Sequence, residues 1–193
     1  MKDIKLAIGM VSAGSVKTKT VFALCRMIKS LKYDFNFIIK EGAILHWNRE
    51  HIVKAAIENN CTHLLFVDTD MYFEPDAIHR LLAREKDIVG VHSHAKTISS
   101  TTTVHMDAIK KSRIKIDHPD GFLTCDAVGT GFMLINLDVF KHISEPWFFW
   151  ESNDKGELVT GEDYWFCEKA RKAGFDVWVD LTIPIKHIGD YFY

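Results

Sequence analysis

Residues 63–75 read HLLFVDTDMYFEP, and this stretch decides how the rest of the chain is interpreted. Its apolar run, 64–67, is typical of a short strand buried on both faces of a sheet. Asp68 and Asp70 follow directly, where open α/β sheets bind ligands, outside the carboxyl ends of their strands. Because side chains two residues apart on an extended segment point to the same side, both carboxylates can face one site. Two like charges there favour a divalent cation between them.

This acidic pair also has a plainer explanation. Two acids can terminate a strand and cap the structure that follows, and an Asp-x-Asp motif is short. Beyond the pair, Pro75 favours the start of an amphipathic helix with apolar residues at 77, 78, 81 and 82. The choice between a ligand site and a strand end therefore depends on the rest of the chain.

The composition suits one globular domain with a substantial core. The chain has 193 residues, of which 47% are hydrophobic and 26% are charged. A net charge of -2 gives no electrostatic reason to bind nucleic acid or a membrane surface. Charged residues interrupt the apolar N-terminus, so it does not resemble a signal peptide, and no apolar run reaches the length of a transmembrane segment. The cysteines form no Cys-x-x-Cys pair, which favours reduced thiols, and we expect a cytoplasmic protein.

The alternation of apolar patterns predicts the fold class. Strands are expected at 4–11, 35–39 and 64–67, with helical spacing between them. This order favours an α/β domain over residues 1–193, with a mostly parallel sheet, right-handed crossovers and flanking helices. Residues 99–118 are expected to add a small irregular or antiparallel part.

Polar residues in the turns are candidates for a binding site. Ser12 follows the first strand in a turn of small residues that a ligand can approach closely, although an ordinary turn explains it equally. Arg49 stands near a helix start, where the dipole disfavours a cation, so either a role in a site or a surface position accounts for it. Gly129, Thr130 and Gly131 predict a tight loop with exposed backbone donors, suited to a sugar or phosphate.

The residues after the 87–91 strand and the aromatic run at 147–150 each leave two interpretations open. His92 and His94 can bind a metal, or they can form a polar loop that brings Lys96 near a phosphate. The aromatic side chains at 147–150 can stack on a sugar ring, but we expect them to pack in the core.

Two positions nearer the C-terminus have structural explanations of their own. Thr160 and Asp163 resemble a capping box at the start of a helix, which would account for Asp163 without any chemistry. His187 lies between apolar neighbours, as a buried core histidine does. Each residue by itself says little about function.

In combination, the order of these motifs resembles the GT-A fold glycosyltransferases, especially small bacterial, phage and large-virus members close to family 2. The resemblance covers nearly the whole chain and rests on motifs at 47–49 (WNR), 66–71 (FVDTDM), 128–132 (VGTGF), 161–167 (GEDYWFC) and 186–189 (KHIG). Any one of these motifs is weak evidence. Their common order and spacing are specific.

This resemblance implies roles on the donor side of a site. Asp70 and His187 would bind a divalent metal, and Asp68 would contact the nucleotide directly or the metal through water. Ser12 and Arg49 would line the pocket for the nucleotide. Oxygen ligands with one imidazole suit Mn²⁺, and Mg²⁺ is the alternative cofactor.

The same resemblance implies the reaction. The enzyme would move a sugar from a nucleotide-sugar donor to a hydroxyl of a glycan, protein or lipid-linked acceptor, with inversion at the sugar carbon. Asp163 would act as the general base, and Glu162 would support it or the acceptor. The nucleotide-binding half would span about 1–95, and the acceptor half would span 96–193. The short C-terminus after His187 leads us to expect that another domain or protein helps to bind the acceptor.

Two other functions compete with a glycosyltransferase. Haloacid-dehalogenase-type phosphatases also carry an Asp-x-Asp after an apolar strand, but usually on their first strand, whereas here the motif follows the third. A non-catalytic module that keeps the nucleotide-sugar pocket is the other alternative. The presence of both Asp163 and His187 argues against that alternative.

Overall fold

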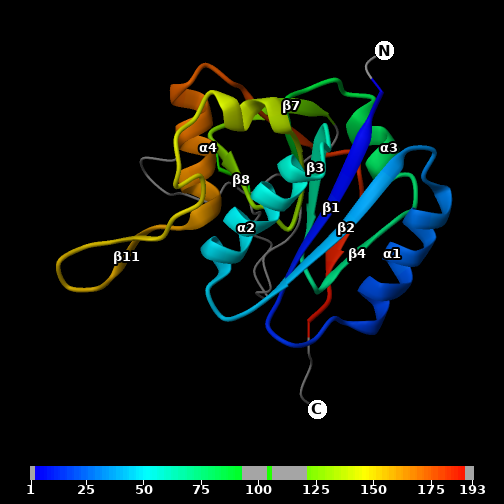
Figure 1. Cartoon of the computed structure of the whole chain (residues 1–193), viewed down its shortest axis with the longest axis horizontal. Helices are drawn as coiled ribbons and strands as arrows, with labels where there is room; N and C mark the ends of the chain where they lie inside the picture. The colour runs from blue at the N-terminus through cyan, green and yellow to red at the C-terminus, as the bar shows by residue number, and fades with distance from the viewer. Residues whose placement is uncertain (1–2, 93–103, 106–120, 190–193) are drawn as a thin grey trace.

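A computed structural model describes residues 3–92, 104–105 and 121–189 (Figure 1). The central sheet of this described part has seven strands in the order β2-β1-β3-β9-β5-β12-β7. Their bounds are β1 (Lys5–Ser12), β2 (Asp34–Glu41), β3 (His63–Val67), β5 (Ile88–Val91), β7 (Phe122–Cys125), β9 (Phe132–Asn136) and β12 (Val177–Asp180). All run in one direction except β7 and β9. The predicted α/β class with a mostly parallel sheet is confirmed.

Short antiparallel pairs complete the strands, as expected. They are β4 (Met71–Phe73) with β13 (Ile185–His187), β10 (Glu151–Ser152) with β11 (Leu158–Thr160), and β6 (Val104–His105) with β8 (Ala127–Val128). The β10–β11 hairpin extends away from the body of the domain (Figure 1). Most of the predicted irregular segment at 99–118, together with His94 and Lys96, lies outside the described residues.

Helices cover both faces of the sheet because its strand residues alternate between two apolar clusters. The helices are α1 (Thr18–Ser30), α2 (Leu45–Glu58), α3 (Ala77–Leu82) and α4 (Glu162–Lys172), with a 3₁₀ turn η1 (Leu137–Lys141). In β3, Leu65 packs with residues of α1 and α3, whereas Leu64 and Phe66 pack with residues of α2 and α4. All of these strand side chains are 0% exposed. The prediction of a strand buried on both faces is confirmed.

The edge strand β2 differs from this pattern. The strand predicted at 35–39 forms, but Phe35, Phe37 and Ile39 are 39%, 40% and 49% exposed. Among the described strands, β2 pairs with β1 alone, so no other described strand extends the core beyond it. Within the ranges that the structure describes, no helix combines the length and apolar character needed to cross a membrane.

The capping box expected at Thr160 and Asp163 is wrong. Helix α4 has Gly161 as its N-cap residue, and no side chain caps it. Thr160 belongs to β11, and its hydroxyl donates across the hairpin to Glu151 Oε2 at 3.2 Å. Asp163 therefore does not act as half of a reciprocal cap, although its carboxylate accepts the N–H of Tyr164 in the first turn of α4.

Gly9 allows α2 to pack closely against β1, and we expect Gly9→Ala to destabilise the fold. A Cβ atom at this position would lie 2.5 Å from Ile52 Cγ2 and 3.0 Å from Leu64 Cδ1. Overpacking of this kind costs about 1–3 kcal/mol. Urea unfolding measures the loss, with Gly189→Ala as the control because a Cβ there meets nothing within 4 Å. Equal stability of the two variants would show that the core can adjust to the extra methyl group.

Candidate functional site

The acidic pair lies at the carboxyl end of β3, in the middle of the sheet. The backbone N–H of Asp68 donates to Gly131 O at 2.9 Å, which joins the pair to the loop before β9. A Cβ on Gly131 would stand only 3.1 Å from Asp68 Oδ2, so a residue with a side chain would crowd this carboxylate. Thr130 is buried and does not line the pocket beside the pair. The Gly129–Gly131 region thus shapes the loop that abuts Asp68.

A pocket of about 270 Å³ opens beside the pair. Its lining comes from the ends of the first three strands and the start of α2: Val11, Ala13, Gly42, Ala43, Leu45, Asp68, Thr69 and Asp70. Segment 42–45 was not singled out from the sequence, although it follows the carboxyl end of a parallel strand, where such sites form. Ser12 does not line the pocket, since its hydroxyl accepts the Gly14 N–H at 3.0 Å and donates to Ser15 O at 3.3 Å. This residue shapes the turn that presents its two neighbours.

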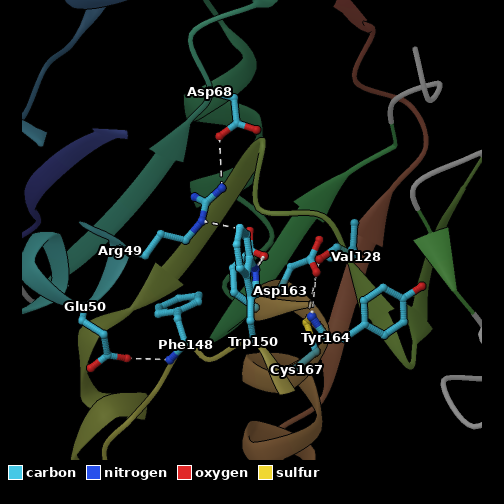
Figure 2. Close-up of polar contacts among 10 residues, drawn as sticks. Arg49, Glu50, Asp68, Val128, Phe148, Trp150, Asp163, Tyr164 and Cys167 are labelled. Atoms are coloured by element: carbon cyan, nitrogen blue, oxygen red, sulfur yellow. Dashed lines mark hydrogen bonds and ion pairs between the residues drawn. The ribbon is translucent and has the colours of Figure 1, made fainter. Parts of the chain in front are cut away.

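Arg49 is a buried link between the acidic pair and helix α4. The residue is 2% exposed, and its Nη2 donates to Asp68 Oδ1 at 3.2 Å (Figure 2). Its Nε lies 3.5 Å from Glu162 Oε1, and the guanidinium lies over the Phe66 ring at 5.1 Å. The guanidinium therefore sits beneath the site, where its charge balances one carboxylate on each side. The surface-arginine explanation is wrong.

Glu162 and Asp163 are neighbours in sequence but have different surroundings. Glu162 receives the Trp150 indole N–H at its Oε2, with a distance of 2.5 Å, and pairs with Arg49 through its Oε1. The Asp163 carboxylate accepts the backbone N–H of Tyr164 at 2.8 Å (Figure 2). Burial, reinforced by the Glu162 charge and partly opposed by Arg49, raises the pKa of Asp163 to about 7. A carboxylate of this kind can accept a proton near neutral pH.

Strand pairing brings His187 beside the acidic pair. His187 is the register partner of Met71, and the N–H of Ile188 donates to Asp70 O at 2.7 Å. The donor types suit a hard divalent cation, since Asp70 offers a carboxylate and His187 an imidazole. Among the residues described, no three His, Cys, Asp or Glu side chains already form a metal cluster. Since Asp68 is engaged by Arg49, a cation here would complete its coordination with ligand phosphate oxygens and water.

The aromatic run corrects the prediction that all four side chains pack in the core. Trp147 and Phe148 are 7% and 0% exposed, but Phe149 and Trp150 are 39% and 40% exposed. The hydrogen bond from Trp150 to Glu162 was not foreseen, because nothing in the local pattern relates these residues. The sequence feature that could have indicated this contact is the position of the aromatic residues shortly before the GED motif at 161–163.

Comparisons with solved structures identify the fold. No family model matches the sequence, and no curated protein does either. A197 from STIV matches with a TM-score of 0.70 at 17% identity, over 97% of this chain and 87% of that chain. GalNAc-T7 solved with UDP, GalNAc and Mn²⁺ has a TM-score of 0.66 at 8% identity, over 97% of this chain and 44% of its own. The inositol-1-phosphate CTP transferase from T. maritima has a TM-score of 0.54 at 13% identity, over 96% and 89% of the two chains. At these identities the likeness shows the fold, which is the predicted GT-A fold.

Removing the buried guanidinium should destabilise the domain strongly. Arg49→Met leaves buried Glu162 without its cation, which typically costs about 3–5 kcal/mol for a buried ion pair, whereas Asp68, whose side chain is 34% exposed, can be solvated. Arg26→Met is the matched control, since Arg26 also pairs at 3.2 Å, with Glu74, but both side chains are well exposed. The control should lose at most about 1 kcal/mol. Urea unfolding of both variants checks this, and similar losses would show that the Arg49 pairs are effectively solvated.

Proposed function

We propose that this chain is a metal-dependent glycosyltransferase that moves a sugar from a nucleotide-sugar donor to an acceptor hydroxyl with inversion. One observation carries the proposal: Arg49 pairs with Asp68, beside the pocket, and with Glu162, the residue before the candidate base Asp163. This link supports a single site that would contain both a donor-binding region and a candidate base. The similarity in fold to GalNAc-T7, which was solved with UDP, GalNAc and Mn²⁺, supports this assignment.

On the donor side, the pocket beside Asp68 and Asp70 would hold the nucleoside. Asp70 and His187 would hold Mn²⁺ or Mg²⁺ against the diphosphate. When bound, the cation would stabilise the negative charge that develops on the leaving diphosphate. Asp68, oriented by Arg49, would contact the nucleotide or a water on the cation. In this proposal, residues 1–95 would mainly bind the nucleotide, and residues 96–193 would mainly bind the acceptor.

On the acceptor side, Asp163 would take the proton of the attacking hydroxyl. The acceptor oxygen then forms a bond to the anomeric carbon as the bond to the diphosphate oxygen breaks, so the configuration inverts. The raised pKa of Asp163, caused mainly by burial, suits it to this transfer near neutral pH. Glu162 is held by Arg49 and Trp150, so its role would be to position the base rather than to accept the proton.

The metal assignment predicts that nucleoside-diphosphate binding depends on a divalent cation. Calorimetric titration with UDP and Mn²⁺ should show binding that excess EDTA abolishes, because the diphosphate then meets the Asp68 and Asp70 charges directly. Asp70→Asn should weaken the UDP affinity at least tenfold, whereas Asp34→Asn, at an exposed position on β2, should not change it. Undiminished binding in EDTA would remove the cation from the proposal.

The general-base assignment predicts that Asp163→Asn keeps donor affinity but lowers the transfer rate by roughly 10²–10⁴-fold. The rate of the parent should rise with pH through about 7, the pKa of Asp163, because only the carboxylate can accept a proton. Sugar transfer would release the nucleoside diphosphate, whereas pyrophosphate release would indicate a nucleotidyltransferase instead. A variant that transfers sugar at the parental rate would exclude Asp163 as the base.

The same raised pKa has a consequence for stability. The folded state binds the proton of Asp163 more tightly than the unfolded state does. The contribution of this residue to the free energy of unfolding therefore falls as the pH rises from about 4 through 7. Asp163→Asn should remove this contribution and be more stable than the parent above pH 7. Urea unfolding at pH 5 and pH 8 measures the difference. If Asp163→Asn changes the free energy of unfolding equally at the two pH values, the fold does not raise the pKa of Asp163.

A further inference from the structure

We propose that Phe149 and Trp150 form an aromatic platform that stacks on a sugar ring of the acceptor, so that the acceptor is a carbohydrate. This inference rests on the proposed function and specifies its acceptor. The two side chains are 39% and 40% exposed, although they directly follow the fully buried Phe148. His46 and Trp165 lie behind them, with the His46 ring 5.3 Å from Trp150 and the Trp165 ring 5.3 Å from Phe149.

The backbone beneath the platform is fastened by two helices. Glu50 of α2 accepts the Phe148 N–H at 2.5 Å, and Lys54 of α2 pairs with Glu145 at 2.6 Å (Figure 2 shows the Glu50 contact). From α4, Lys169 Nζ donates to Pro146 O at 2.9 Å. The backbone that leads into the two rings is therefore fixed before a ligand arrives, which lowers the entropy lost on binding.

The platform lies beside the proposed base. The indole N–H of Trp150 is used by Glu162, the residue before Asp163, so the polar edge of the ring is satisfied inside the protein (Figure 2). Because the indole N–H of Trp150 already has a partner, the part of the ring that solvent reaches is apolar. A group stacked on Trp150 would be close to α4, where a hydroxyl must reach Asp163.

The platform and the donor pocket meet at the first turn of α2. Leu45 lines the pocket, and the next residue, His46, contacts the rings of Phe149 and Trp150. A ligand on the platform would thus approach the donor from across this turn. Glu151, which follows Trp150 in the chain, and Thr160 put a carboxylate and a hydroxyl at the stem of the β10–β11 hairpin, where they bond to each other.

A sugar ring fits this mixture better than other acceptors do. Its C–H face is apolar enough to cover an aromatic ring, and its hydroxyls can bond to a rim of carboxylate and hydroxyl oxygens. A lipid chain would gain nothing from these oxygens. An extended peptide would use backbone hydrogen bonds, which two aromatic side chains do not supply.

Saturation-transfer NMR tests the platform, with UDP and Mn²⁺ present and methyl glycosides of glucose, galactose, mannose and N-acetylglucosamine as probes. A Ser/Thr-containing peptide serves as the probe for a protein acceptor. At least one glycoside should bind the parent protein. Saturation should then pass most strongly to the C–H protons on one face of its sugar ring. Phe149→Leu and Trp150→Leu should weaken its affinity about tenfold. Phe37→Leu is the matched control, since Phe37 is 40% exposed on the edge strand β2, and it should not change the affinity.

Calorimetry with UDP on each protein separates this inference from the function on which it rests. Failure of the parent to bind UDP would contradict the proposed function itself. With UDP binding intact, equal glycoside affinity in Phe149→Leu and the parent would overturn the platform. Phe149→Leu is decisive because a phenylalanine side chain has no polar atom, so this substitution, unlike one at Trp150, removes no hydrogen bond to Glu162. Binding of the peptide and of no glycoside would also overturn the proposal, in favour of a protein acceptor.

Discussion

The ion pairs of buried Arg49 connect the parts of the candidate site. The guanidinium lies between Asp68, at the end of β3, and Glu162, at the start of α4, and stacks over Phe66. The buried guanidinium needs a counter-charge, and buried Glu162 needs a cation, so these two groups fix each other in place, while the half-buried Asp68 is oriented by the same guanidinium. The distance between the pocket and α4 is therefore set by charge neutralisation as well as by apolar packing.

The asymmetry between the two acids of α4 follows from that constraint. Glu162 forms an ion pair with the Arg49 guanidinium and accepts the Trp150 indole N–H, whereas Asp163 is half-buried, accepts one backbone N–H and has the Glu162 charge beside it. Adjacent residues on a helix point in different directions, so one cation cannot serve both equally. As a result, the Glu162 carboxylate is held by two side chains, and the pKa of the Asp163 carboxyl is raised. That division is what a positioning residue and a proton acceptor require.

Apolar surface is distributed unevenly around this site. The residues behind it are packed from both faces of the sheet, and Gly9 lets α2 approach β1 closely enough to carry Arg49 inward. In front of it, Phe149 and Trp150 remain open although the chain before them is buried. Exposed aromatic side chains next to a tightly packed core are typical of a surface that binds a ligand.

Local pattern in the sequence was sufficient for the α/β class, the strand buried on both faces and the position of Asp68 and Asp70 at its end. Those features depend on periods of two and 3.6 residues and on where an apolar run stops. Only the tertiary structure decided that Arg49 is buried, that β13 places His187 beside Asp70, and that half of the aromatic run is exposed. These facts depend on strand order and on pairs of residues far apart in the chain, and no local spacing encodes which distant segments become neighbours.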